Sequence, residues 1–124
     1  MNGSVLIVDD DPVGCLLSQR ALERAGCTVE VASDGLQGLE RIRAHEFDVI
    51  ITDIQMPEMD GREMCESMYE EFPDRKPLVI VVTGRAEPEV GEWALEIPGC
   101  IFVQKPISVV QLVEQIRRQL GTQE

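Results

Sequence analysis

The chain has little positive charge: 11 Lys and Arg stand against 23 Asp and Glu in 124 residues, a formal net charge of −12. No cluster of basic residues interrupts this acidic balance. An acidic surface repels nucleic acid phosphates and anionic lipid headgroups, because like charges would have to approach one another. The composition therefore predicts a protein that binds neither nucleic acid nor a membrane surface directly.

Signals for metal-binding cysteines and for membrane spans are equally scarce. The single His45 and four cysteines without a C-x-x-C pair disfavour a Cys/His zinc site and favour reduced thiols. The apolar run over residues 5–8 stops at Asp9, and no basic region precedes it. Nowhere do the roughly 18 apolar residues of a transmembrane helix follow one another. We therefore expect no signal peptide, no membrane span and a cytoplasmic location.

The length of 124 residues suits one domain, since domains usually contain about 100–150 residues. No linker or repeat divides the sequence, so we expect a single domain over residues 1–124 with a folded core over 4–120. Apolar runs that predict strands lie at 5–8, 28–32, 49–51, 78–82 and 100–103. Most are continuous rather than alternating, which is typical of parallel strands covered on both faces.

Helices are expected between and after these strands. Four of them begin at a residue suited to a helix start. The first begins at Asp11 followed by Pro12, the second at Ser33 or Asp34, the third near Asp60, and the last at Ser108. Leu36, Leu39 and Ile42 would form the apolar face of the second helix. Gly121 would follow the last helix as its C′ residue, and a weaker fourth helix is expected over 87–97. Five strands and five helices in alternation predict an α/β fold with one parallel sheet.

Polar residues gather where the predicted strands end. They are Asp9, Asp10 and Asp11 after the first strand, Asp53 after the third, Thr83 after the fourth and Lys105 after the fifth. Each alone could have a local role, such as a helix cap or a turn. However, the carboxyl ends of strands meet at one edge of such a sheet. Carboxylates gathered there repel unless a cation such as Mg²⁺ joins them, and hydroxyl and ammonium groups bind phosphoryl oxygens. The cluster predicts a phosphoryl-transfer site with an aspartate nucleophile.

Two aspartates compete for the role of nucleophile, and the first is Asp9. Residues 9–13, D-D-D-P-V, resemble the D-x-D-x-[TV] motif of haloacid-dehalogenase-like phosphatases, in which the first aspartate attacks. Thr83 and Lys105 resemble later motifs of that family. The acidic pair that should follow on a later strand to hold Mg²⁺ is missing from the sequence. This alternative therefore lacks its metal site.

The second candidate nucleophile is Asp53, which lies within an ordered set of motifs. They are V-L-I-V-D-D-D-P at 5–12, I-I-T-D-I-Q-M-P-E-M-D-G at 50–61, V-V-T-G at 81–84 and Q-K-P at 104–106. In these motifs the chain resembles a receiver domain of two-component response regulators over essentially its whole length. The resemblance implies a flavodoxin-like, doubly wound fold, with five helices and one five-stranded parallel sheet in the order 2-1-3-4-5.

The resemblance also implies the phosphorylation chemistry. Asp53 would accept the phosphoryl group as an aspartyl phosphate. Asp9 and Asp10 would hold Mg²⁺ together with Asp53 and the backbone carbonyl of Gln55. The chain would then catalyse its own phosphorylation and dephosphorylation without being a conventional enzyme.

Further residues take implied roles around the phosphoryl group. Thr83 and Lys105 would contact its oxygens, and Thr83 would couple to the aromatic Phe102 in a conformational switch. Phe102 could equally be ordinary core packing, and its lack of a hydroxyl excludes any switch that needs a tyrosine hydrogen bond. Gln55 and Arg85 occupy the two positions that tune dephosphorylation in this family.

The partners implied by the resemblance are proteins. A sensor histidine kinase or a histidine phosphotransfer protein would donate the phosphoryl group. A downstream protein or a fused output domain would receive the signal, with a phosphorylation-dependent dimer as one form of output. The chain would be either a stand-alone receiver or the N-terminal module of a longer response regulator.

Overall fold

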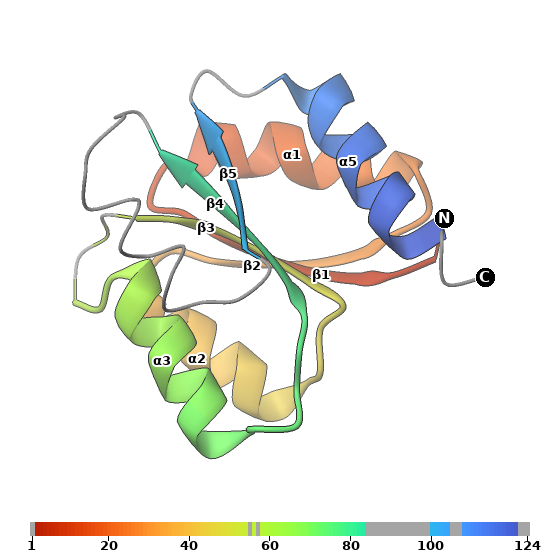
Figure 1. Ribbon diagram of the computed structural model, residues 1–124. Helices are drawn as coiled ribbons and strands as arrows, with labels where there is room; N and C mark the ends of the chain where they lie inside the picture. Colours follow the sequence, from red (N-terminus) through yellow and green to blue (C-terminus); the bar gives the residue numbers. More distant parts are fainter. Residues whose placement is uncertain (1, 55, 57, 84–99, 105–107, 122–124) are drawn as a thin grey trace.

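A single parallel sheet forms the centre of the fold (Figure 1). The structure is a computed structural model that describes residues 2–54, 56, 58–83, 100–104 and 108–121. The strands are β1 (Ser4–Val8), β2 (Thr28–Ala32), β3 (Val49–Asp53), β4 (Leu78–Thr83) and β5 (Ile101–Gln104). They pair in parallel in the order β2-β1-β3-β4-β5, which confirms the expected sheet.

Helices cover both faces of this sheet. Those within the described residues are α1 (Pro12–Arg24), α2 (Gly35–Ala44), α3 (Gly61–Glu71) and α5 (Val109–Gly121). Figure 1 shows α1 and α5 on one side of the sheet, here called the α1–α5 face, and α2 and α3 on the other, the α2–α3 face. The described residues thus contain four helices rather than five, because the helix expected over 87–97 lies outside them. None of these helices is long and apolar enough to cross a bilayer.

The apolar strands form one core on each face. Along β1, Leu6 and Val8 pack into the core on the α2–α3 face, whereas Val5 and Ile7 pack into the core on the α1–α5 face. This division follows from the strand geometry, in which successive side chains point to opposite sides. Because both sides are buried, both sets of positions are apolar, and the sequence runs are continuous.

The helix starts follow the predicted caps. The capping hydrogen bonds are Val13 N–H to Asp11 Oδ1 (3.1 Å), Gln37 N–H to Asp34 Oδ1 (2.8 Å), Glu63 N–H to Asp60 Oδ1 (2.8 Å) and Gln111 N–H to Ser108 Oγ (3.3 Å). Each satisfies a backbone donor that the first turn of a helix leaves without an intrahelical partner. Asp34, rather than Ser33, is the cap of α2.

Two details of the predicted helices are wrong. Leu36 is 44% exposed and is not part of the apolar face of α2, whose buried residues are Gly35, Gly38, Leu39 and Ile42. The contact stripe contains two glycines, which bring α2 close to its neighbours and leave Leu36 outside the stripe. Gly121 is the last residue of α5 rather than the residue after it.

Close approach through these glycines is characteristic of the α2–α3 face. A Cβ atom at Gly38 would lie 2.5 Å from Met64 Sδ of α3. A Cβ atom at Gly35 would overlap the backbone carbonyl of Met59, which accepts the Gly35 N–H at 3.0 Å. The backbone of Met59 therefore leaves no room for a side chain at position 35, whereas a side chain at position 38 would require Met64 to shift.

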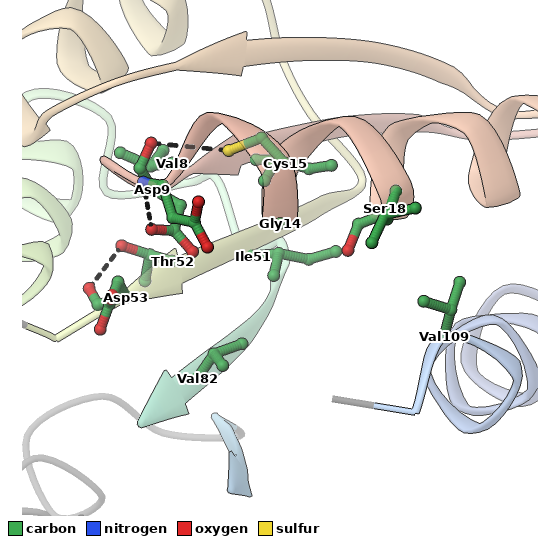
Figure 2. Close-up of a pocket in the computed structure, with 13 residues that line it drawn as sticks. Val8, Asp9, Gly14, Cys15, Ser18, Ile51, Thr52, Asp53, Val82 and Val109 are labelled. Carbon is green, nitrogen blue, oxygen red and sulfur yellow. Dashed lines mark hydrogen bonds between the residues drawn. The ribbon is translucent and has the colours of Figure 1, made fainter. Parts of the chain in front are cut away.

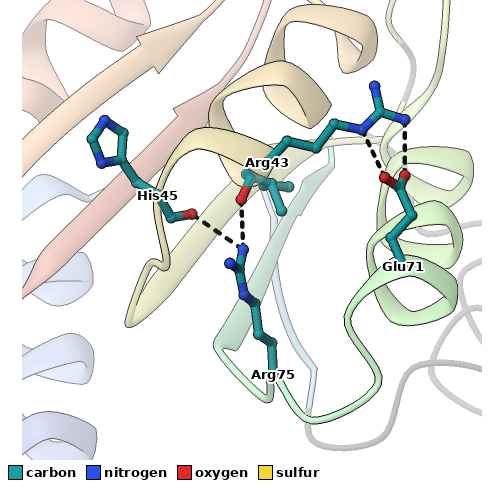
Figure 3. A network of polar contacts seen from close by, with 5 residues as sticks. Arg43, His45, Glu71 and Arg75 are labelled. Carbon is teal, nitrogen blue, oxygen red and sulfur yellow. Dashed lines mark hydrogen bonds and ion pairs between the residues drawn. The ribbon is translucent and has the colours of Figure 1, made fainter.

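Polar contacts join the C-terminal ends of α2 and α3 (Figure 3). Arg43 of α2 donates two hydrogen bonds of 2.8 Å to the carboxylate of Glu71 on α3. Arg75, in the loop after α3, donates to the backbone carbonyls of Ile42 at 2.5 Å and His45 at 3.3 Å. Arg75 thereby satisfies carbonyl groups that the C-terminal end of a helix leaves without an intrahelical partner.

Candidate functional site

Three predicted carboxylates meet at the carboxyl edge of the sheet. One carboxylate oxygen from each of Asp9, Asp10 and Asp53 lies within 4.8 Å of the other two. Asp9 and Asp10 follow β1, and Asp53 is the last residue of the adjacent β3. Asp9 and Asp53 are half-buried, and Asp10 is exposed. The structure thus brings together the three side chains that the family resemblance implies as metal ligands.

Local hydrogen bonds hold Asp9 at the end of β1. Its N–H donates to the carbonyl of Ala32 at the end of β2 (3.1 Å), and its Oδ1 accepts the Asp11 N–H (2.9 Å). Its backbone carbonyl accepts the thiol of the buried Cys15 on α1 at 3.5 Å. Asp9 is therefore tied to β2, to α1 and to the turn between β1 and α1. Asp11 serves as the α1 cap, as expected.

Asp53 is held through the peptide group that follows it. The Ile54 N–H donates to Asp53 Oδ1 at 2.7 Å, and the hydroxyl of Thr52 donates to the Asp53 backbone carbonyl at 2.9 Å. The Thr52 side chain is fully buried. These contacts fix both the backbone and the carboxylate of the predicted nucleophile.

A cavity of about 540 Å³ adjoins the carboxylates on the α1–α5 face (Figure 2). Asp9 and Asp53 line one end of it. Its apolar walls are formed by residues of β1, β3, β4, α1 and the first turn of α5: Ile7, Ile51, Val82, Leu17 and Val109. The carboxylates therefore lie at the border of an apolar cavity rather than on a flat polar surface.

The other predicted site residues are described only in part. Thr83 ends β4, where its backbone pairs with Gln104 of β5. Phe102 of β5 is half-buried and packs against the core of the α2–α3 face. Three predicted residues lie outside the described residues: Gln55, Arg85 and Lys105. Their roles, and those of Thr83 and Phe102 in a switch, stay predictions.

The carboxylates fit a magnesium ion by their chemistry and their spacing. Mg²⁺ prefers oxygen ligands in an octahedron with bonds of about 2.1 Å, so its ligand atoms lie roughly 3–4 Å from one another. The carboxylate oxygens of Asp9, Asp10 and Asp53, which lie within 4.8 Å of one another, are close to this spacing. A divalent cation would also offset the repulsion between Asp9, Asp10 and Asp53.

Sequence reasoning missed Thr52 and assigned no role to Gly61. A Cβ atom at Gly61 would lie 2.5 Å from the Asp53 carbonyl oxygen and 2.7 Å from Thr52 Oγ1. One signal for Thr52 was available: a hydroxyl within an otherwise apolar strand covered on both faces needs a hydrogen-bond partner inside the protein. No comparable sequence signal marks the close approach at Gly61.

Comparison with known proteins gives a consistent match. Residues 5–117 match the family described as the response regulator receiver domain. The chain is 34% identical over 122 residues to the polar-differentiation response regulator DivK of Brucella ovis, covering 98% of both chains. It is 35% identical over 120 residues to part of the sensor histidine kinase GacS of Pseudomonas protegens, covering 94% of this chain and 13% of the kinase.

Solved structures give the same match. A CheY-like receiver domain protein from Methanospirillum hungatei superposes with a TM-score of 0.88 at 31% identity, covering 99% of this chain and 97% of that one. The chemotaxis protein CheY4 of Vibrio cholerae gives a TM-score of 0.86 at 27% identity, covering 95% and 98%. None of these relatives supports the haloacid-dehalogenase-like alternative.

Proposed function

Because the chain belongs to the response regulator receiver domain family, we propose that Asp53 accepts a phosphoryl group in a Mg²⁺-dependent reaction. The donor is a phosphohistidine on a sensor histidine kinase or a histidine phosphotransfer protein. The observation that carries the proposal is the convergence of Asp9, Asp10 and Asp53, whose carboxylate oxygens lie within 4.8 Å of one another. Phosphorylation then changes the surface that the domain presents to its partner.

The proposed transfer is a displacement at phosphorus. A carboxylate oxygen of Asp53 attacks, a P–O bond forms, the P–N bond of the phosphohistidine breaks, and the imidazole nitrogen keeps the electron pair. Asp9, Asp10, Asp53 and the backbone carbonyl of Gln55 would hold Mg²⁺, which would neutralise charge on the transferring group. The hydrogen bond from the Ile54 N–H to Asp53 Oδ1 restricts rotation of this carboxylate.

The remaining roles belong to the same proposal. Thr83 and Lys105 contact the phosphoryl oxygens as a hydroxyl donor and a point charge. Thr83 then moves with Phe102, whose half-buried ring packs against the core of the α2–α3 face. Substitution of Gln55 or Arg85 changes the lifetime of the phosphorylated form; unchanged hydrolysis in both variants would exclude this tuning role.

The proposed setting is the cytoplasm, where the domain acts through protein contacts. The output is a downstream protein partner, a fused output domain or a phosphorylation-dependent dimer. Direct binding to nucleic acid is not part of the proposal, since the net charge of −12 opposes contact with phosphate backbones. The same acidic balance opposes binding to anionic membranes.

Intact mass spectrometry tests the proposed phosphoacceptor. The wild-type chain, incubated with Mg²⁺ and a small phosphoramidate, should gain one phosphoryl group, because such a donor carries the same P–N bond. Asp53→Asn and metal chelation should each abolish the adduct. Asp74→Asn, which changes an exposed aspartate in the loop after α3, should leave the adduct intact.

Two outcomes would contradict the proposal. A wild-type chain without any adduct would be a receiver that is not phosphorylated. An adduct that persists in Asp53→Asn and disappears in Asp9→Asn would identify Asp9 as the nucleophile, as in the phosphatase-like alternative.

A further inference from the structure

The peptide group between Asp53 and Ile54 is held at both of its ends. At one end, its carbonyl oxygen accepts the Thr52 hydroxyl at 2.9 Å, the contact drawn between Thr52 and Asp53 in Figure 2. At the other end, its N–H donates to Oδ1 of the Asp53 carboxylate at 2.7 Å. A peptide group is planar, so its carbonyl and its N–H rotate together. The orientation of the Asp53 carboxylate is thereby linked to the hydroxyl of Thr52.

Thr52 is itself firmly placed. Its side chain is fully buried, and β3 pairs with β1 on one side and β4 on the other. Threonine is branched at Cβ, which restricts rotation about χ1. The Asp53 carbonyl therefore has a hydrogen-bond partner that is fixed by the protein, unlike an exchanging water molecule.

The first residue of α3 closes over this hydrogen bond. A Cβ atom at Gly61 would lie 2.7 Å from Thr52 Oγ1 and 2.5 Å from the Asp53 carbonyl oxygen, so the backbone of α3 contacts both partners. The Gly61 N–H also donates to the carbonyl of Ile54 at 3.3 Å, which holds the next peptide group. Two successive peptide groups after β3 are therefore restrained from the same side.

We propose that Thr52 is a positioning residue for the phosphoacceptor and acts through the Asp53–Ile54 peptide group. This inference rests on the proposed function, which makes Asp53 the nucleophile. Thr52 does not touch the phosphoryl group; it sets the N–H that aims the attacking carboxylate. Small displacements of reacting groups are costly, since a misplacement of about 1 Å can lower a rate roughly 10²-fold.

A simpler role for Thr52 is to satisfy its own buried hydroxyl. That role predicts a loss of stability on substitution but no change at Ile54 or in the phosphorylation rate. Three variants separate the two roles. Thr52→Val removes the hydroxyl and keeps the shape, Thr52→Ser keeps the hydroxyl, and Thr28→Val makes the same chemical change at an exposed position of β2.

The amide proton of Ile54 provides a readout that does not depend on phosphorylation. A hydrogen bond to a carboxylate shifts an amide resonance downfield and slows its exchange with solvent. In Thr52→Val we expect the Ile54 resonance to move upfield and its exchange to accelerate several-fold, while both stay near wild type in Thr52→Ser and Thr28→Val. An unchanged Ile54 amide in Thr52→Val would overturn the linkage.

The phosphorylation rate tests the consequence. At saturating Mg²⁺ and phosphoramidate, Thr52→Val should be phosphorylated about tenfold more slowly, with Thr52→Ser and Thr28→Val within about twofold of wild type. A rate for Thr52→Val within twofold of wild type, or a Thr52→Ser as slow as Thr52→Val, would overturn the positioning role. If Thr52→Val did not fold, Thr52→Cys, whose thiol is a much weaker donor than a hydroxyl, would replace it in both measurements.

The two proposals fail in different ways. If the wild type were not phosphorylated on Asp53, the proposed function would fail, whatever the Ile54 amide showed. If the wild type were phosphorylated on Asp53 and Thr52→Val behaved like wild type, only the positioning role would fail.

Discussion

The two faces of the sheet differ in how their helices are held. On the α2–α3 face, glycines bring the layers together, Arg43 binds Glu71, and Arg75 binds the end of α2. The α1–α5 face instead contains a cavity of about 540 Å³. Val13 of α1 and Val110 of α5 are 65% and 74% exposed, more than Leu36 of α2 at 44%.

Because of this difference, one face holds Asp53 in place and the other leaves space beside it. Asp53 lies at the end of β3, and the first residue of α3 restrains the peptide group that follows it from the α2–α3 side. The cavity beside Asp9 and Asp53 opens on the other face, under α1. Asp53, the proposed nucleophile, is thus held from the α2–α3 side, while the cavity on the α1–α5 side leaves room beside it.

The largest effect is expected when a glycine near the start of one helix on each face is replaced by alanine. In Gly35→Ala the new Cβ meets the backbone of Met59, which cannot move away alone, so we expect a loss of about 2–3 kcal/mol in the free energy of unfolding. In Gly14→Ala the nearest atom, 3.0 Å away, is a carboxylate oxygen of Asp11, which has to shift by only a few tenths of an ångström and can keep its capping bond to the Val13 N–H. The better helix propensity of alanine should then stabilise by about 0.5 kcal/mol. Urea unfolding measures both.

Equal effects of the two alanines would remove the distinction between the faces. Far-ultraviolet circular dichroism on the same samples checks that both variants keep their helices. A loss of stability in Gly14→Ala would show that the start of α1 is as closely packed as the start of α2.

A smaller effect is expected from Arg75→Ala. This change removes hydrogen bonds to the carbonyls of Ile42 and His45 and the stacking of the guanidinium on Phe72, 3.9 Å from the ring centre. We expect a loss of about 1–2 kcal/mol. The control is Arg20→Ala on the exposed side of α1, which should stay within about 0.5 kcal/mol of wild type. An equal loss of stability in Arg20→Ala would show that the effect of Arg75→Ala does not come from its contacts with the end of α2 and Phe72.

The smallest effect concerns the pH dependence of the Arg43–Glu71 pair. The hydrogen bond from Arg43 lowers the pKa of Glu71 below its usual 4.5. A lowered carboxyl pKa stabilises the fold above the unfolded value and loses this contribution as the pH falls through the folded value. The stability difference between wild type and Arg43→Gln should therefore be small at pH 7 and shrink further as the pH falls below 4.5 and through the lowered pKa of Glu71.

Salt and a second pair complete the test of Arg43. Both partners are exposed, so 1 M salt should reduce the difference at pH 7. Arg117→Gln breaks a pair within α5 and should not change how α2 and α3 are joined. A difference that persisted unchanged at pH 3 would exclude the charge of Glu71 as its cause.

The sheet and the carboxylate cluster were predictable from the sequence because they depend on local patterns. Continuous apolar runs identified the five strands, and the carboxyl ends of parallel strands share one edge of the sheet. The order that places β1 beside β3, and so Asp9 and Asp10 beside Asp53, came from the family resemblance. The capping aspartates Asp11, Asp34 and Asp60 also follow from local chemistry. The family resemblance then supplied the predicted roles of Asp9, Asp10 and Asp53.

The rest depends on contacts between elements. Leu36 was placed on the wrong side of α2 because a count of apolar residues gives glycine no weight, whereas Gly35 and Gly38 are the positions of closest contact. Thr52 stood out only as a hydroxyl in an apolar strand, and its partner, the Asp53 backbone carbonyl, cannot be identified from a side-chain pattern. The cavity requires the spacing of α1 from the sheet, which periodicity does not encode.

The position of β1 has a consequence for biosynthesis. β1 lies between β2 and β3, and the Ser4 N–H donates to the carboxylate of Asp48, 44 residues later. A ribosome adds about 5–20 residues per second, so the apolar residues of β1 wait roughly 2–9 s for their second neighbour to be synthesised. During that interval β1 has apolar surface on both faces and one unpaired edge. The nascent chain is therefore exposed to aggregation and to chaperones during this interval.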